Sequence, residues 1–277
     1  MTDHERNQLT GFLRDKARWV RSETLKIHRI AQETRIASSL SAVEIFVALF
    51  YGNIVAHDPK NPRWEGRDRL IISKGHGSIS FYPILADLGY FDKQELFRVC
   101  KEGSFLGGIP DPLIPGYESV NGSLGHGLGV SCGMAAALKR KNREETVFAL
   151  IGDGELYEGS VWEAIMFGGE HRLDNLIAII DNNGACMLDY CKNVLDLDPI
   201  DQKFSAFRWQ ARTVDGHDLA KLHTALLDLK NDRSGRPKVL IANTVKGKGV
   251  PALEGDPLSH IRNIPPDRID AAIRGLK

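Results

Sequence analysis

The sequence predicts an α/β fold: a doubly wound parallel sheet with helices on both faces. Two observations lead to this prediction. Apolar segments of strand length alternate with helical segments along most of the 277-residue chain, and several strand-like segments run directly into loops rich in glycine and polar residues. Strands that alternate with helices in this way pair in parallel, and the helices cover the sheet.

The clearest unit lies between residues 147 and 187. Two strand-like runs, 147–151 and 176–180, flank a helical segment over 157–169. A strand–helix–strand unit of this kind places its two strands in parallel and side by side. Ligands of open α/β sheets bind at the carboxyl ends of the strands, so the loops after both strands are expected at a binding site.

Upstream of this unit, periodic apolar residues predict helices over 9–35, 39–51 and 81–88 and a strand over 69–73. Ser41 or Ser38 can cap the second helix, and Glu44, three residues after Ser41, predicts a capping box. The strand runs into the loop Lys74-Gly75-His76-Gly77. The glycine- and proline-rich segment 103–116 predicts a long loop, and the glycines that follow it open a helix over 130–141.

Downstream of the unit the same alternation continues to the last strand. The expected elements are a loop with a short helix over 194–207, a strand over 209–214, a helix over 218–230, a strand over 238–244 and a short helix over 267–276. Because no repeat, low-complexity segment or linker interrupts the chain, one domain is expected, with residues 251–277 as a C-terminal tail.

Composition excludes several classes of function. The 36 basic and 36 acidic residues balance, so charge gives no reason to expect nucleic-acid binding. No apolar run reaches the roughly 18 residues of a membrane span, and the polar N-terminus is unlike a signal peptide, so a cytoplasmic protein is expected. Cys100, Cys132, Cys186 and Cys191 form no CxxC pair and are expected to be reduced, with Cys186 and Cys191 as metal ligands the less favoured alternative.

The two central loops carry complementary chemistry. Gly152 and Gly154 lack side chains, so backbone N–H groups there can approach a phosphate closely. Asp153 offers a carboxylate, Asn183 an amide oxygen and Ala185 a backbone carbonyl. Three such oxygens leave room for diphosphate oxygens and water around Mg²⁺, so the metal and a diphosphate are expected to bind together.

These loops resemble the thiamine-diphosphate (ThDP) motif, in which a Gly-Asp-Gly turn is followed by an asparagine, here thirty residues from Asp153 to Asn183. The wider sequence resembles the transketolase family over residues 25–263, in the segments SLSAVEI, DRLIISKGHG, NGSLGHGLG, GDGELYEG, IIDNNGACMLD, VDGHD and TVKGKGV. The resemblance is to the diphosphate-binding domain, so residues 1–277 are expected to form a single domain of that type. The chain stops where the family's pyrimidine-binding domain begins. In this respect the chain resembles the N-terminal subunit of a split, two-component transketolase.

The resemblance implies three sets of site residues. The metal ligands are Asp153, Asn183 and the carbonyl of Ala185. The cofactor-binding set is His76, Gly122, Leu124, Gly152, Asp153, Gly154, Glu155, Asn183 and His260. The catalytic set combines Glu158 and His76, which the resemblance implies, with Arg35, which departs from the family pattern, and Glu158 is expected to reach a partner subunit.

The resemblance also implies a partner, because the glutamate that activates ThDP in this family belongs to the pyrimidine-binding domain. The chain alone is therefore expected to be inactive and to work with a C-terminal, pyrimidine-binding subunit, in an α2β2 assembly. Lys246 and Lys248 either touch phosphate or lie on a solvated loop, whereas His126, His217 and His223 are expected to have no role.

Two positions depart from the family pattern and leave the reaction open. Arg35 and Ile109 stand where sugar transketolases carry histidines that contact the donor sugar. One alternative is ketol transfer between sugars. The other is acetyl transfer from a 2-keto acid such as pyruvate, with Arg35 on its carboxylate and Ile109 on its methyl group. Two further alternatives are less favoured: a non-catalytic subunit of the same fold, and the diphosphate-binding subunit of a keto-acid dehydrogenase.

Overall fold

The computed structural model describes residues 2–187 and 189–276, and its centre is one sheet of five strands in the order β1-β2-β3-β5-β4. The strands are β1 (Arg69–Ile72), β2 (Val147–Gly152), β3 (Leu176–Asn182), β4 (Gln210–Asp215) and β5 (Lys238–Asn243). Each neighbouring pair is parallel, so all the strands end at the same edge of the sheet. The predicted parallel α/β fold and the pairing of β2 with β3 are confirmed.

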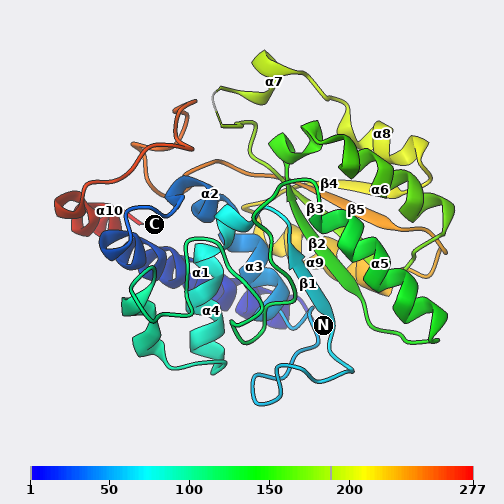
Figure 1. Cartoon of the computed structure of the whole chain (residues 1–277), viewed down its shortest axis with the longest axis horizontal. Helices are drawn as coiled ribbons and strands as arrows, with labels where there is room; N and C mark the ends of the chain where they lie inside the picture. The colour runs from blue at the N-terminus through cyan, green and yellow to red at the C-terminus, as the bar shows by residue number, and fades with distance from the viewer. Residues whose placement is uncertain (1, 188, 277) are drawn as a thin grey trace.

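Helices precede β1, lie between successive strands and follow β5 (Figure 1), and most of the α-helices overlap the predicted segments. The α-helices are α1 (Asp3–Ile30), α2 (Ile36–Ser41), α3 (Val43–Phe50), α4 (Phe81–Leu88), α5 (Gly127–Arg140), α6 (Gly159–Glu170), α7 (Cys191–Val194), α8 (Ile200–Ala206), α9 (Leu219–Asn231) and α10 (Ile269–Arg274). Short 3-10 helices are η1 (Gly75–Ser80), η2 (Lys93–Arg98), η3 (Asp153–Tyr157) and η4 (Pro266–Arg268). None of the helices in the described ranges is long and apolar enough to cross a membrane.

Both faces of the sheet are covered, because alternate strand residues point to opposite sides. Phe148 and Leu240 belong to a buried cluster with apolar residues of α1, α3, α4 and α9. Ala149 and Ile241 belong to a second cluster, with residues of α5, α6 and α8. Figure 1 shows α5 and α6 on one side of the strands and α1 and α4 on the other.

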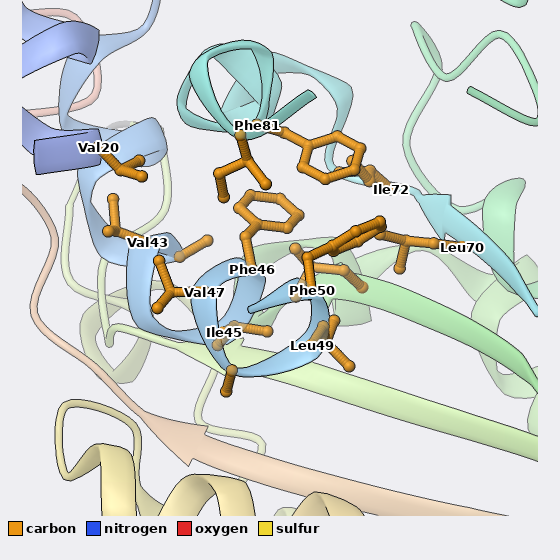
Figure 2. Packing of buried hydrophobic residues seen from close by; sticks show 14 of the residues in the cluster. Val20, Val43, Ile45, Phe46, Val47, Leu49, Phe50, Leu70, Ile72 and Phe81 are labelled. Carbon is orange, nitrogen blue, oxygen red and sulfur yellow. The ribbon is translucent and has the colours of Figure 1, made fainter. Parts of the chain in front are cut away.

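Aromatic side chains fill the space between α3, α4 and the end of β1. Phe46 and Phe50 of α3 contact Phe81 of α4, with ring centroids 5.1 and 4.8 Å apart. Figure 2 shows these rings beside Leu70 and Ile72 of β1. This packing holds β1, and therefore the loop that follows it, against the first helical layer.

The C-terminal segment packs back onto the N-terminal helices. Val250, Leu253 and Ile269 form a buried cluster with Leu25 of α1 and Ile36 of α2. In Figure 1 α10 lies beside α1. The segment expected as a tail is therefore part of the packed structure over the range described.

Several predicted helix boundaries differ from the observed ones. The helix expected over 39–51 is divided at Ala42 (φ −92°, ψ 4°) into α2 and α3. The capping box does not form, because the Ser41 hydroxyl donates to Asp181 Oδ2 (2.6 Å) and Glu44 pairs with Arg21. The helix expected over 9–35 starts at a different capping box, that of Thr2, and ends at Ile30.

The helix expected over 157–169 begins later, at Gly159, with Glu158 as its N-cap. The residues before it form the 3-10 turn η3, in which the carboxylate of Glu155 folds back to accept the backbone N–H of Gly152 (3.3 Å). This turn places the Gly-Asp-Gly loop at the carboxyl end of β2.

Candidate functional site

A cavity of about 420 Å³ lies at the carboxyl ends of the strands. It brings together ten of the predicted residues, which come from the loops after β1, β2 and β3, the loop before α5 and the C-terminal segment. These residues are His76, Gly122, Leu124, Gly152, Asp153, Gly154, Glu155, Asn183, Ala185 and His260. A larger cavity of about 590 Å³, between residues 60–67 and 112–118, contains none of the predicted site residues.

Asp153 joins the two central loops. Its Oδ1 accepts the N–H of Gly154 (2.8 Å), and its Oδ2 accepts the N–H of Gly184 (2.5 Å). The side chain is buried, and burial together with the nearby Asp181 charge raises the pKa of its carboxyl to about 6. A buried carboxylate of this kind is well suited to take a cation.

Asn183 and Ala185 supply the other two oxygens of the predicted metal set. Asn183 Oδ1 accepts the N–H of Ala185 (3.2 Å), and both residues border the cavity beside Asp153. In the described ranges no group of three or more His, Cys, Asp or Glu side chains could hold a metal. The predicted set depends instead on one carboxylate, one amide and one carbonyl. Cys186 and Cys191 are free thiols.

Two buried lysines, Lys74 and Lys246, contribute positive charge to the cavity wall. Lys246 Nζ donates to the carbonyls of Ala185 (2.6 Å) and Cys186 (3.2 Å), and burial and the Lys74 charge lower its pKa to about 8. Of the two alternatives for this lysine, the solvated loop is therefore wrong. Lys248 is half-buried, lies outside the cavity lining and offers its backbone carbonyl to Arg21 (3.0 Å).

Lys74 and Asp181 form a buried ion pair that sequence reasoning missed. Asp181 is fully buried, and it also accepts hydrogen bonds from Ser41 and Thr244. The pair therefore ties the end of β1 to β3, α2 and the residue after β5. The signal that could have identified them is their position, since each lies at the end of a strand-like run beside a predicted site loop.

His76 and His260 both line the cavity, and their rings are in contact, with centroids 5.0 Å apart. Burial, followed by the Lys74 charge, lowers the pKa of His76 to about 2. Burial, followed by the Lys246 charge, lowers the pKa of His260 to about 4. Both rings are therefore neutral at pH 7, and each offers one N–H donor and one acceptor nitrogen.

Glu155 lines the cavity, but its oxygens are bonded to the protein. Its carboxylate accepts hydrogen bonds from Ser73 Oγ, Gly125 N–H (2.8 Å) and Gly152 N–H (3.3 Å). Burial raises the pKa of this carboxyl. The glycine-rich start of α5 is held tightly as a result. Gly125 has φ +86°, and a Cβ there would lie 2.7 Å from Glu158 Cβ.

Glu158, Arg35 and Ile109 lie outside the cavity lining, and all three are exposed. Arg35 is close enough to His260 for its charge to help lower the pKa of that imidazole. Ile109, in the loop over 103–116, is 48% exposed. The structure thus gathers the predicted cofactor and metal residues, and it leaves two of the predicted catalytic residues and Ile109 outside the lining.

The family model "Transketolase, thiamine diphosphate binding domain" matches residues 20–275. This chain belongs to the transketolase family. The fold agrees: a transketolase from Campylobacter jejuni has a crystal structure with a TM-score of 0.84 and 28% identity to this chain. That match covers 96% of this chain and 42% of the Campylobacter protein.

Curated members of the transketolase family include proteins of similar length that are named as subunits. A 6-deoxy-6-sulfo-D-fructose transketolase subunit of Clostridium sp. (strain MSTE9) is 37% identical over 243 residues, 87% of this chain and 88% of the relative. An apulose-4-phosphate transketolase subunit of Actinobacillus succinogenes is 37% identical over 241 residues, 87% of this chain and 86% of the relative. Human transketolase is 35% identical over 267 residues, which cover 95% of this chain and 42% of the human protein. These matches confirm the resemblance to the N-terminal subunit type.

Proposed function

We propose that this chain is the ThDP- and Mg²⁺-binding subunit of a two-component transketolase that transfers a two-carbon unit to an aldose or keto-sugar acceptor. The observation that carries the proposal is one cavity in which Asp153, Asn183 and the Ala185 carbonyl lie together with His76 and His260. Membership of the ThDP-binding family supports the cofactor.

The residues of the cavity fit both proposed ligands. A carboxylate, an amide oxygen and a carbonyl are hard oxygen ligands of the kind that Mg²⁺ takes, and the diphosphate would complete its coordination. The pKa of Asp153 stays raised although Lys246 is near, so a divalent cation would stabilise this carboxylate. Gly154 lies close to the facing loop, where a Cβ would sit 3.1 Å from Cys186 Cβ.

Bound ThDP supplies the nucleophilic carbon and the electron sink for cleaving a carbon–carbon bond beside a carbonyl. Asp153, Asn183 and Ala185 would hold the metal. His76 and His260, both neutral, can donate an N–H to phosphate or substrate oxygens. Gly122, Gly152 and Gly154 leave the backbone open to the ligand, and Leu124 contributes apolar surface to the lining.

We further propose a C-terminal, pyrimidine-binding partner subunit in an α2β2 assembly. The names of the relatives as transketolase subunits support a split enzyme. Glu158 is exposed at the start of α6, where it can reach a second polypeptide. Turnover by this chain alone would contradict the need for a partner. The cytoplasmic location remains a prediction.

The test of the site is titration of ThDP into the chain and its partner subunit, with and without Mg²⁺. We expect tight binding only when the metal is present, because a single carboxylate and the diphosphate must share the cation. Equal affinity after chelation of all divalent metal would refute the metal site.

A second candidate reaction is acetyl transfer with release of CO₂ from pyruvate, favoured by Arg35 and Ile109 in place of donor-binding histidines. Arg35 lies near His260 and is exposed, and a guanidinium suits a carboxylate, a phosphate or a sulfonate. The names of two relatives include a sulfonated and a phosphorylated sugar, which are anionic substrates.

A donor screen with both subunits present separates the two reactions. CO₂ release from pyruvate supports acetyl transfer, and turnover of xylulose 5-phosphate without CO₂ supports ketol transfer. If neither occurs although ThDP and Mg²⁺ bind, the non-catalytic alternative gains support. Arg35→Gln is expected to raise KM for an anionic donor more than it lowers kcat.

A further inference from the structure

The loop after β5, residues 244–250, carries Lys246 into the cavity. We propose that His217 is a positioning residue for this loop: by binding Val245, it sets the place of the Lys246 ammonium at the cofactor site. His217 itself is not among the residues that line the cavity. The inference deepens the proposed function and rests on it for the nature of the ligand.

The imidazole of His217 is held from both sides. Its Nε2 accepts the backbone N–H of Val245 (2.8 Å), so the proton of the neutral ring is assigned to Nδ1. Nδ1 then donates to Glu44 Oε2 (3.0 Å), which also accepts from Arg21 Nη2 (2.6 Å). Although burial opposes it, the Arg21 charge and the His217 contact lower the pKa of Glu44 to about 2. Glu44 is therefore a fixed anion that orients both partners.

Arg21, the other partner of Glu44, holds the part of the loop that follows Lys246. Arg21 Nε donates to the carbonyl of Lys248 (3.0 Å). Gly247, between the two lysines, has φ +79° and donates its N–H to the Ala37 carbonyl (3.0 Å). The backbone is therefore fixed immediately before and after Lys246.

The turn that carries His217 is also packed against the start of the loop. Gly216 donates its N–H to the carbonyl of Asn243 (2.7 Å), and a Cβ at Gly216 would lie 2.5 Å from Thr244 Cγ2. The segments VDGHD (214–218) and TVKGKGV (244–250) thus form one interlocked unit. The role that we assign to VDGHD is to hold the loop 244–250 from outside the cavity lining.

The position of Lys246 matters because its ammonium is buried and has specific partners. Lys246 is 6% exposed, and it binds the carbonyl of Ala185, the same group that is proposed as a metal ligand. A loop released at Val245 would move the ammonium relative to the diphosphate and to the metal loop. The expected consequence is weaker ThDP binding, with no side chain of the cavity changed.

Two variants separate the hydrogen bonds of His217. His217→Gln keeps an acceptor near the place of Nε2 and so keeps the bond to Val245, whereas His217→Asn keeps only a donor toward Glu44. His223→Gln is the matched control, because His223 is a buried histidine whose Nε2 binds the carbonyl of Gly52 (2.9 Å), away from the loop.

The first measurement is amide hydrogen exchange of the full chain over residues 244–250, with α5 as an internal check of the fold. His217→Asn should speed exchange in the loop and leave α5 protected, whereas in His217→Gln and the control the loop should exchange as in the wild type. Unchanged loop exchange in His217→Asn would overturn the inference. This readout needs no cofactor, so it decides the anchoring role even if the proposed function fails.

The second measurement is ThDP affinity in the presence of Mg²⁺ and the partner subunit. His217→Asn is expected to weaken binding about tenfold, the size of effect for loss of one buried hydrogen bond. His217→Gln and His223→Gln should stay within about threefold of the wild type.

A double-mutant cycle with Lys246→Met then tests whether His217 affects ThDP affinity through Lys246. If His217 acts through Lys246, His217→Asn should change ThDP affinity less than about twofold in the Lys246→Met background. Full additivity would overturn the route through Lys246. A wild-type complex that binds no ThDP refutes the proposed function instead.

Discussion

The Oδ2 atom of Asp153 accepts a 2.5 Å hydrogen bond from the backbone N–H of Gly184. This bond joins the loops after β2 and β3, which are neighbouring parallel strands. The carboxylate is therefore placed beside Asn183 and Ala185 by the sheet itself, and the proposed metal site depends on this residue more than on any other.

Replacing Asp153 with asparagine should greatly weaken metal-dependent ThDP binding. The amide carries no charge for the cation, and its NH₂ group cannot accept the N–H of Gly154 or Gly184. We expect affinity to fall about 100-fold or more, at or beyond the upper range for changes around a metal site. Isothermal titration with Mg²⁺ and the partner subunit measures this. Asp201→Asn, on the exposed start of α8, is the control and should leave affinity unchanged.

Metal-dependent binding should weaken in acid because a proton competes with Mg²⁺ for Asp153. The carboxyl has a pKa of about 6, so it is ionised at pH 7.5 and protonated at pH 5. Below that pKa, affinity for Mg²⁺ with ThDP should fall about tenfold per pH unit. A flat affinity profile from pH 7.5 to 5 would contradict the assignment.

The unliganded chain should respond to pH in the opposite direction at this residue. Its raised pKa means that the folded state holds a proton that the unfolded chain releases between pH 3.8 and about 6. The contribution of Asp153 to stability therefore decreases as the pH rises through that window. In Asp153→Asn this decrease should be missing from the pH dependence of the free energy of unfolding.

Breaking the buried ion pair between Lys74 and Asp181 should destabilise the fold strongly. Asp181→Asn leaves the Lys74 ammonium buried without its counter-charge, and the expected cost is about 3–5 kcal/mol in the free energy of unfolding. Glu170→Gln is the matched control. It breaks the exposed Arg208–Glu170 pair, whose side chains are 66% and 72% exposed, and should cost below about 1 kcal/mol. If urea denaturation showed similar losses in the free energy of unfolding for the two variants, the larger contribution expected of the buried pair would be contradicted.

Two glycines of α5 should respond in opposite ways to alanine. A Cβ at Gly127 would lie 2.3 Å from Ser73 Oγ and 2.9 Å from its Cα, so Gly127→Ala should cost about 1–3 kcal/mol. Gly133 has open space around it, and Gly133→Ala should stabilise the chain by about 0.5–1 kcal/mol through helix propensity. Thermal unfolding of the isolated chain measures both, and equal shifts in Tm would refute the close packing of Gly127 on Ser73.

The parallel sheet and the composition of the cavity can be predicted from the sequence, because both depend on where strands end. A glycine loop after an apolar run places its residues at the carboxyl edge wherever the strand lies in the sheet. Asp153, Asn183, His76 and Gly154 are located in this way. The place of Lys74 in the cavity wall could not be predicted in this way, although it begins one of these loops, because a lysine in a loop is usually exposed.

The wrong predictions arise where tertiary contacts override local signals. Ser41 and Glu44 have the spacing of a capping box, yet each contacts a distant partner, Asp181 for the serine and Arg21 for the glutamate. His217 belongs to VDGHD, one of the segments that resemble the family, but the sequence does not show what this histidine contacts. Its contact with Val245 joins residues far apart in the chain, and only the fold shows it.

The return of the C-terminal segment onto α1 and α2 bears on how this chain can be fused to another. Cutting after Val250 would remove His260 from the cavity and uncover Leu25 and Ile36. An engineered single polypeptide that joins this chain to the proposed pyrimidine-binding partner therefore needs its junction beyond α10, which ends at Arg274. A chain cut after Val250 would lack one histidine of the His76–His260 pair and would expose apolar residues, which favours aggregation.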